Sequence, residues 1–190
     1  HALEYEPAQM AALGSKCLVG DQLHPNGAIN PDTYASIAPA YARIARLESF
    51  LEGARQVSEI AILSSEYFHH AGDANASADD GAAQMLLEMK LPFDVLDGLS
   101  DFSPYKVIIL PDDIPVEGEI AGKLKAYVAG GGALLLTGSS GFGEDGDFAF
   151  DAGIRRQGEI AFTPSYVKVV PGIDATLTRT PFIVYGTANR

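Results

Sequence analysis

The chain has 190 residues, which is enough for one sizeable domain and some additional structure. Its apolar fraction of 47% is that of a globular protein and argues against disorder. The formal net charge of −12 at pH 7 argues against a nucleic-acid partner, because phosphates attract Lys and Arg, and it is in keeping with a soluble protein. The single cysteine, Cys17, excludes an internal disulfide and any multi-cysteine metal site.

No run of about 18 apolar residues is present, so we expect no membrane-spanning helix and no membrane partner. The sequence contains no signal peptide, and it begins at His1 rather than at Met. We therefore expect a processed or excised piece of a soluble protein. The compartment stays open because exported proteins can also lack disulfides, and the cytoplasm is the favoured location.

The first thirty residues predict a helix, a strand and a turn. Residues 4–14 have the pattern of a short helix that Gly14 ends. Residues 16–20 (KCLVG) predict a short apolar strand, and residues 21–30 are rich in turn-forming residues.

A long helix is expected next. Asn30 is a good N-cap, and Pro31 occupies the first helical position, where its missing N–H costs nothing. Pro39 predicts a kink, and Gly53 ends the helix. Its apolar side chains fall three or four residues apart in one stripe: Tyr34, Ile37, Tyr41, Ile44, Leu47 and Leu51. This stripe either packs on its own domain or forms an interface with another domain or subunit.

An alternation of strands and helices follows. Strands are expected at 57–63, 93–96, 105–110 and 133–137, and helices at 79–89 and 116–129. The last two strands have the composition of strands buried on both faces. Such an alternation predicts right-handed crossovers, a mainly parallel sheet and a three-layer α/β/α sandwich. Two further extended segments are expected at 167–170 and 182–185.

Ligands of open α/β sheets bind beyond the carboxyl ends of the strands, so these ends were searched for chemistry. Ser139 and Ser140 follow a strand, and His69 or His70 could supply the base that a serine hydrolase needs. The G-x-S-x-G elbow is not met, however, because Phe142 stands at its last position. A free-standing α/β hydrolase or small-ligand-binding domain remains the alternative function.

The loop after the last of these strands matches the G-x-G-x-x-G pattern at residues 141–146. No apolar helix follows it, and its acidic residues would repel a phosphate, so we expect no dinucleotide. The acids also lack the regular spacing of a calcium-binding loop. We therefore expect no cofactor and no metal.

Asp21, Gln22 and His24 are crowded directly after the predicted strand 16–20. Polar residues in this place suit the end of a barrel strand, where sugars are bound by hydrogen bonds. They fit equally well an ordinary turn that caps a helix.

These features carry a resemblance to a known family. Residues 20–27 (GDQLHPNG), the helix that starts at Asn30 and the segment 57–63 resemble the junction in glycoside hydrolases related to family 42 β-galactosidases. There a (β/α)₈ barrel ends and a middle domain begins. Residues 105–141 look like that middle domain, the β-galactosidase trimerisation domain. Its fold is flavodoxin-like and similar to class I glutamine amidotransferases.

The resemblance implies four segments: residues 1–27 are the remnant of an upstream barrel, 28–54 a linking helix, 55–165 the amidotransferase-like domain and 166–190 a following segment or closing strands. In the family the catalytic carboxylates lie in the barrel, and the middle domain helps to assemble the trimer. The nucleophilic cysteine and the His-x-Glu pair of amidotransferases are absent here.

The leading hypothesis is therefore a non-catalytic assembly and support domain of a β-galactosidase-like glycoside hydrolase, with no catalytic residue in this piece. The implied partners are the upstream barrel of the same polypeptide, further copies in a homotrimer, and a carbohydrate bound by the parent. Asp21, Gln22 and His24 would contact the sugar. The contact between barrel and domain would use the first four residues of the stripe, Tyr34, Ile37, Tyr41 and Ile44.

Overall fold

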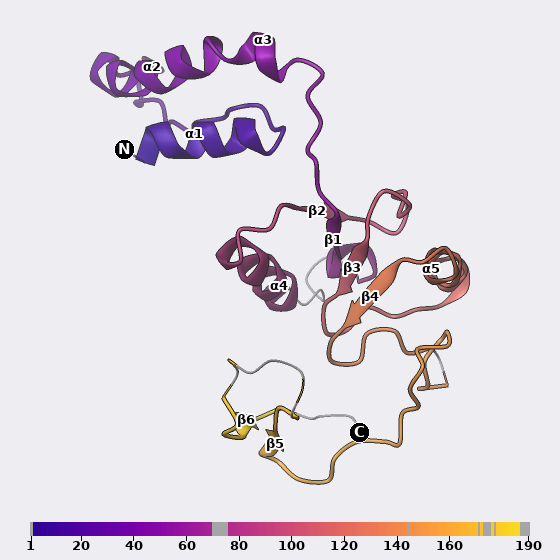
Figure 1. The fold of residues 1–190 in the computed structure, drawn as a ribbon. Coiled ribbons are helices and arrows are strands. Elements are labelled where there is room, and N and C mark those ends of the chain that lie inside the picture. Colours follow the sequence, from indigo (N-terminus) through magenta and orange to yellow (C-terminus); the bar gives the residue numbers. More distant parts are fainter. Residues whose placement is uncertain are drawn as a thin grey trace. The chain divides into compact units, whose positions relative to one another are not determined.

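The computed structural model describes residues 2–69, 76–143, 145–170, 172, 176 and 178–186. The chain divides into two compact units, His1–Val57 and Ser58–Arg190 (Figure 1). Within the described residues, every helix is too short or too polar to cross a lipid bilayer.

The first unit is a pair of helices joined by an irregular segment. Its elements are α1 (Ala2–Ala12), α2 (Pro31–Ala45) and α3 (Glu48–Leu51). Helix α1 packs against α2 (Figure 1), and the contact is made by small or compact side chains: Pro7, Ala11, Ala40 and Ile44 are buried. The predicted N-cap is present, since Asn30 Oδ1 accepts hydrogen bonds from the backbone N–H groups of Asp32 (2.9 Å) and Thr33 (3.4 Å).

Two predictions for this unit are wrong. Residues 16–20 do not form a strand, because a strand needs a neighbour to pair with and the described part of the chain offers them none. The second helix includes Pro39 and ends at Ala45, so the single helix expected up to Gly53 is divided into α2 and α3. Ala40 and Ile44 follow the proline and are buried, which offsets the hydrogen bond that proline cannot donate.

The second unit is built on a four-stranded parallel sheet with the order β2-β1-β3-β4. The strands are β1 (Ile60–Leu63), β2 (Phe93–Leu96), β3 (Val107–Leu110) and β4 (Ala133–Leu136). Helix α4 (Ala76–Glu88) joins β1 to β2, and α5 (Gly118–Ala129) joins β3 to β4. A 3₁₀ turn, η1 (Ser65–Tyr67), follows β1 directly.

The two helices cover opposite faces of this sheet. On one face, Ala82 and Leu86 of α4 pack against Ile62 and Ile109. On the other, Leu124 of α5 joins a larger core that contains alternate residues of the same strands, namely Ala61, Leu63, Ile108 and Leu110. The predicted three-layer α/β/α sandwich with a parallel sheet, of the flavodoxin-like and amidotransferase-like kind, is confirmed.

The sequence overestimates the burial of β4. This strand was expected to be buried on both faces, but it has only β3 as a neighbour, and 46% of Leu135 is exposed. The apolar composition of β4 thus led to the wrong prediction of a central strand, whereas β4 lies at the edge of the sheet. Farther along, β5 (Ser165–Val167) and β6 (Phe182–Val184) pair with each other in antiparallel fashion. The first of these begins two residues before the predicted extended segment.

Candidate functional site

The carboxyl ends of β1 and β3 form the switch point of the sheet. From β1 the chain passes through α4 to one side, and from β3 it passes through α5 to the other side. In open α/β sheets this is the place where a ligand binds. The polar groups that follow the two strands are Ser64 and Ser65 after β1 and Asp112 and Asp113 after β3.

The two serines after β4 are held by the backbone beside them. Ser140 is 1% exposed, and its Oγ accepts a hydrogen bond from the Ile114 N–H at 2.9 Å. Ser139 is exposed, and its hydroxyl donates to the Asp112 carbonyl at 3.1 Å. Both hydroxyls therefore tie the loop after β4 to the loop after β3.

His69 lies against the loop after β3 as well. Its Nε2 is 3.1 Å from the carbonyl oxygen of Asp113 and 3.7 Å from the carboxylate Oδ2 of the same residue. Since a carbonyl only accepts, this contact is a hydrogen bond in the tautomer that carries the proton on Nε2, and it directs Nε2 at the backbone. In the described part of the chain no hydrogen bond joins His69 to Ser139 or Ser140. His70 lies outside the described residues.

The best-connected polar group at the switch point was not predicted. Asp79, at the start of α4, accepts hydrogen bonds from the Ser64 hydroxyl and from the Ser65 N–H, both at 2.9 Å. This carboxylate fixes the turn between β1 and η1. No sequence signal joins Asp79 to serines 14 and 15 residues earlier.

Two buried polar atoms near the switch point lack a hydrogen-bond partner among the described residues. Ser65 is completely buried, and neither its Oγ nor the buried Oδ1 of Asp113 has a hydrogen-bond partner among the described residues. Among the residues that the structure describes, no hydrogen-bonded set of nucleophile, base and orienting acid lies around these two atoms. The described residues also contain no group of three or more His, Cys, Asp or Glu side chains placed to hold a metal ion.

Groups with shifted pKa values lie elsewhere: three are in the loop between β2 and β3, and burial raises the pKa of a fourth, Tyr127 in α5. The hydroxyl of Ser100 lowers the pKa of Asp97, and the N–H of Ser103 lowers that of Asp101. Burial, followed by a hydrogen bond to Asp94, raises the pKa of Tyr105 to about 12. Burial of the tyrosines and hydrogen bonds within the loop and against β2 account for these shifts, so they indicate structure rather than catalysis.

The predicted sugar-binding residues Asp21, Gln22 and His24 are all exposed in an irregular segment. The Nε2 of His24 lies 3.5 Å from Nδ2 of Asn30. Sugar binding by these residues would need further protein around them, which the described part of the first unit does not provide. Their role therefore stays a prediction.

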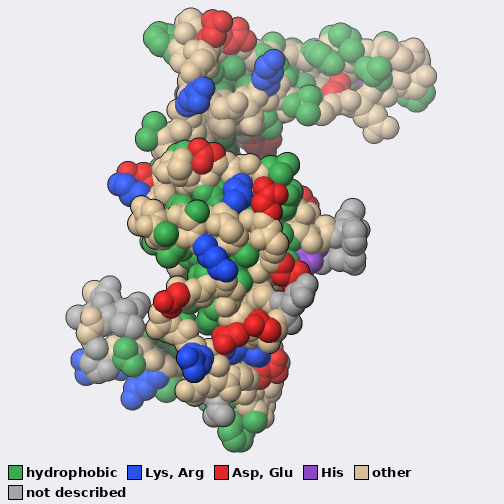
Figure 2. All heavy atoms as spheres, turned by 90° about the vertical axis from the view of Figure 1, so that its right-hand side faces the viewer, with side chains coloured by type: hydrophobic (Ala, Val, Ile, Leu, Met, Phe, Trp, Pro, Cys, Tyr) green, Lys and Arg blue, Asp and Glu red, His purple; other side chains and the backbone are tan. Residues whose placement is uncertain are grey.

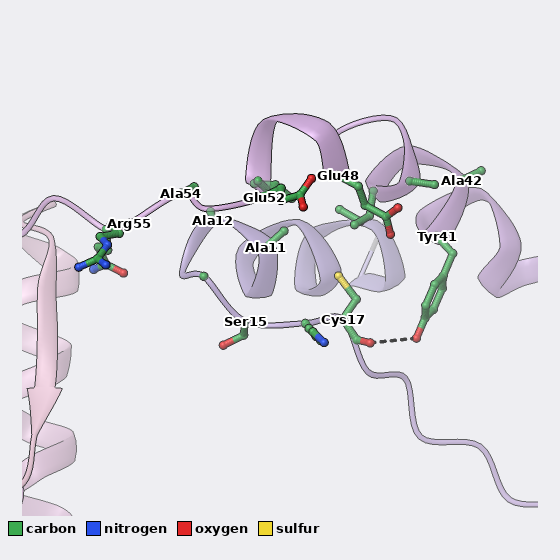
Figure 3. A pocket seen from close by; sticks show the side chains of 16 residues that line it. Ala11, Ala12, Ser15, Cys17, Tyr41, Ala42, Glu48, Glu52, Ala54 and Arg55 are labelled. Atoms are coloured by element: carbon green, nitrogen blue, oxygen red, sulfur yellow. Dashed lines mark hydrogen bonds between the residues drawn. The ribbon is translucent and has the colours of Figure 1, made fainter.

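The predicted interface stripe is divided by the fold of the first unit. Ile44 is 8% exposed and belongs to the contact with α1, whereas Tyr34 and Tyr41 each remain 41% exposed. Ile37 is half-buried. Tyr41 also lines a hollow of about 880 Å³ beside the helices, where its hydroxyl donates to the Cys17 carbonyl at 3.4 Å (Figure 3).

A second hollow, of about 540 Å³, runs along β4. We call it the β4 groove. It is lined by the strand itself and by the loop that follows, including Phe142, Phe148 and Phe150. The ring centroids of Phe142 and Phe148 are 4.9 Å apart, and Phe148 and Phe150 are 6.5 Å apart. Sequence reasoning did not find this groove.

Comparison with known proteins decides what the second unit contains. Residues 84–160 match the family model of the β-galactosidase trimerisation domain. This segment is a β-galactosidase trimerisation domain. The resemblance seen in the sequence is thereby confirmed for the trimerisation domain.

Curated relatives match this chain only locally. The β-galactosidase GanA of Bacillus subtilis is 36% identical over 66 residues, which are 35% of this chain and 10% of GanA. The β-galactosidase Pbg of Clostridium perfringens is 33% identical over 86 residues, which are 45% of this chain and 11% of Pbg. The matched region is thus about a tenth of each relative.

Solved structures extend the similarity to the rest of the chain. α-L-Fucosidase isoenzyme 2 from Paenibacillus thiaminolyticus matches 100% of this chain with 36% identity and a TM-score of 0.86. The match covers 29% of that protein. A catalytic mutant of Gan42B, a GH42 β-galactosidase from G. stearothermophilus, matches 96% of this chain and 31% of its own, with 20% identity and a TM-score of 0.60. The latter shows a shared fold.

Proposed function

We propose that this chain is a non-catalytic assembly and support segment of a larger glycoside hydrolase. The observation that carries the proposal is the match of residues 84–160 to the trimerisation domain. The strand ends support it, because Ser139 and Ser140 are bonded to backbone groups and His69 faces a carbonyl. The alternative, a free-standing hydrolase that uses these residues, is not favoured.

The first unit supports a longer parent protein. Apolar side chains lie among the other atoms on its surface (Figure 2), and the most exposed large ones are Tyr5 (66%), Leu18 (76%), Phe50 (79%) and Val57 (85%). A helix pair with so few buried residues cannot bury enough apolar surface to be stable alone. We propose that an upstream barrel of the same polypeptide covers it.

In this proposal the chain keeps the four expected segments. Residues 1–27 end the barrel, 28–54 link it, 55–165 form the amidotransferase-like domain and 166–190 lead onward. Tyr34, Ile37, Tyr41 and Ile44 then serve the contact with the barrel. Asp21, Gln22 and His24 contribute to sugar binding once the barrel surrounds them.

The sugar of the parent enzyme is a separate question. The β-galactosidase GanA matches 35% of the chain, whereas the α-L-fucosidase structure matches all of it at the same identity of 36%. A GH42 β-galactosidase structure also matches 96% of the chain, the first unit included, but with an identity of only 20%. This difference favours an α-L-fucoside as substrate of the parent, and a β-galactoside is the second candidate.

The test uses the full-length protein that carries this chain and, beside it, the 190-residue chain. Each is assayed with nitrophenyl α-L-fucoside and nitrophenyl β-D-galactoside, and its native mass is measured by sedimentation. We expect the full-length protein to cleave one substrate and to sediment as an oligomer, while the short chain cleaves neither. Hydrolysis by the short chain would disprove the non-catalytic role, and a monomeric full-length protein would disprove the assembly role.

A further inference from the structure

Among the described residues, no helix covers β4 on the face of the sheet where α4 packs. Leu135 is in register with Ile109, so both point to the face that α4 covers. Ile109 is 3% exposed beneath α4, but Leu135 is 46% exposed, and Ala133 is exposed as well. The apolar residues of β4 on this face are therefore presented to the surroundings.

The outer edge of β4 is also open. Among the described strands it pairs only with β3, so its other edge presents backbone N–H and C=O groups. Exposed edges usually carry charged residues or proline that prevent association, but β4 is Ala-Leu-Leu-Leu. The β4 groove continues this apolar surface through the three phenylalanines to Ile154, which is 71% exposed.

The chemistry of the groove restricts what can occupy it. Asp151 is its sole charged lining residue, and the other side chains are apolar or small. The whole chain carries a formal charge of −12, so two copies repel each other except where both surfaces are neutral. With Asp151 as its one charged lining residue among those described, the β4 groove is a nearly neutral surface on which this repulsion is small.

The family match connects the groove with assembly. The residues that line the β4 groove fall between 128 and 154, inside the segment 84–160 that matches the trimerisation domain. The hollow of the first unit, lined by residues between 11 and 56, lies outside that segment. The segment that matches the trimerisation domain thus contains the lining of the β4 groove and none of the lining of the other hollow.

A closed ring of three requires each copy to use two different surfaces, because an isologous contact closes at a dimer. The opposite edge of the same sheet provides the second surface. There β2 exposes Val95 (59%), and the turn after it exposes Leu99 (74%). We propose that the β2 edge of one copy docks in the β4 groove of the next copy. This inference rests on the proposed assembly function and names its interface.

Single charges placed in either surface test the inference. In the full-length protein we would prepare Leu135→Asp and Ile154→Asp in the groove and Val95→Asp on the β2 edge. Val170→Asp, on a side chain that is 60% exposed outside both surfaces, is the control. Native mass is measured by sedimentation, and folding by circular dichroism and thermal unfolding.

We expect all three test variants to sediment at the mass of one subunit while they keep the wild-type melting temperature, and the control to keep the wild-type mass. A mixture of Leu135→Asp with Val95→Asp should form a dimer, since one intact groove then meets one intact edge. Two groove variants that keep the wild-type mass would overturn the proposal. A lower melting temperature at unchanged mass would show that another part of the same polypeptide covers the groove. That result would also overturn the proposal.

Two further outcomes are distinct. If Leu135→Asp dissociates the protein but Val95→Asp does not, the groove is an interface and the β2 edge is not its occupant, so the proposal fails. If the wild-type full-length protein is itself monomeric, the proposed assembly function fails, and this inference fails with it.

Discussion

The N–H of Ile114 donates a hydrogen bond of 2.9 Å to the hydroxyl of Ser140. Both residues are buried, at 0% and 1% exposure, and the bond joins the loops that follow β3 and β4. A serine placed after a strand at the carboxyl edge of a parallel sheet thus serves as a backbone acceptor. Ser140 has the position of a nucleophile in the sheet, but its Oγ accepts a structural hydrogen bond from the backbone.

Replacing Ser140 by Ala should therefore destabilise the protein. The buried Ile114 N–H would lose its acceptor, which costs about 1–3 kcal/mol of unfolding free energy. The control is Ser139→Ala, whose hydroxyl is exposed and whose loss should change stability by less than about 0.5 kcal/mol. Urea unfolding followed by circular dichroism measures both. Equal effects of the two variants would contradict this account of Ser140.

For the two serines after β1, we expect the less buried residue to contribute more to stability. Ser64 donates to Asp79 and accepts from the Glu66 N–H, so Ser64→Ala should lower the unfolding free energy by about 1 kcal/mol. Ser65 is the more buried residue, but its hydroxyl has no partner among the described residues. Ser65→Ala should raise the unfolding free energy by roughly 1 kcal/mol, because it removes a desolvated group. A destabilised Ser65→Ala protein would reveal an undetected partner.

How much of this fold the sequence discloses depends on whether the information is local. Strand β3 and helix α5 were predicted because a run of apolar residues, a helical period and a glycine turn are each readable within a few residues. The exposure of β4 was not predicted, since its place at the edge follows from the order of all four strands. The prediction of a strand at residues 16–20 was wrong for a related reason. A strand needs a neighbouring strand to pair with, and the local sequence does not show whether one is present.

The same limit applies to the candidate site. Ser139 and Ser140 could be named from their place after a strand, but their hydrogen bonds reach back 27 and 26 residues to Asp112 and Ile114. The β4 groove combines a strand with a loop whose phenylalanines looked like part of an irregular acidic segment. Hydrophobic stripes on a helix were visible, as with Ile44, but the sequence did not say which of their members meet α1.

Gly138 should be irreplaceable for steric reasons. Its φ of +58° is disfavoured for any residue with a side chain, and an added Cβ would lie 2.5 Å from the backbone oxygen of Asp112. Gly138→Ala should lower the unfolding free energy by at least about 2 kcal/mol. Gly122→Ala is the control, because this position is in the interior of α5 and has no atom within 4 Å of the added Cβ. There alanine should stabilise the protein by about 1 kcal/mol through its higher helix propensity. Melting temperatures that shift in the same direction would refute the distinction.

Tyr105 should make stability fall at alkaline pH. Its hydroxyl donates to Asp94 at 3.0 Å, and burial together with that bond raises its pKa from 10.0 to about 12. Between these values the unfolded chain has lost the proton that the folded chain still holds, so the unfolding free energy decreases as pH rises. Tyr105→Phe removes this contribution.

The wild type should therefore be more stable than Tyr105→Phe near neutral pH, and the difference should shrink between pH 10 and about 12. Urea unfolding across that interval measures the difference directly. Tyr166→Phe is the control, since its ring is 65% exposed, and it should follow the wild-type pH profile. A difference between wild type and Tyr105→Phe that stays constant with pH would mean that the hydrogen bond to Asp94 does not distinguish the folded from the unfolded titration. Any loss of stability of the wild type at alkaline pH would then have to come from other groups.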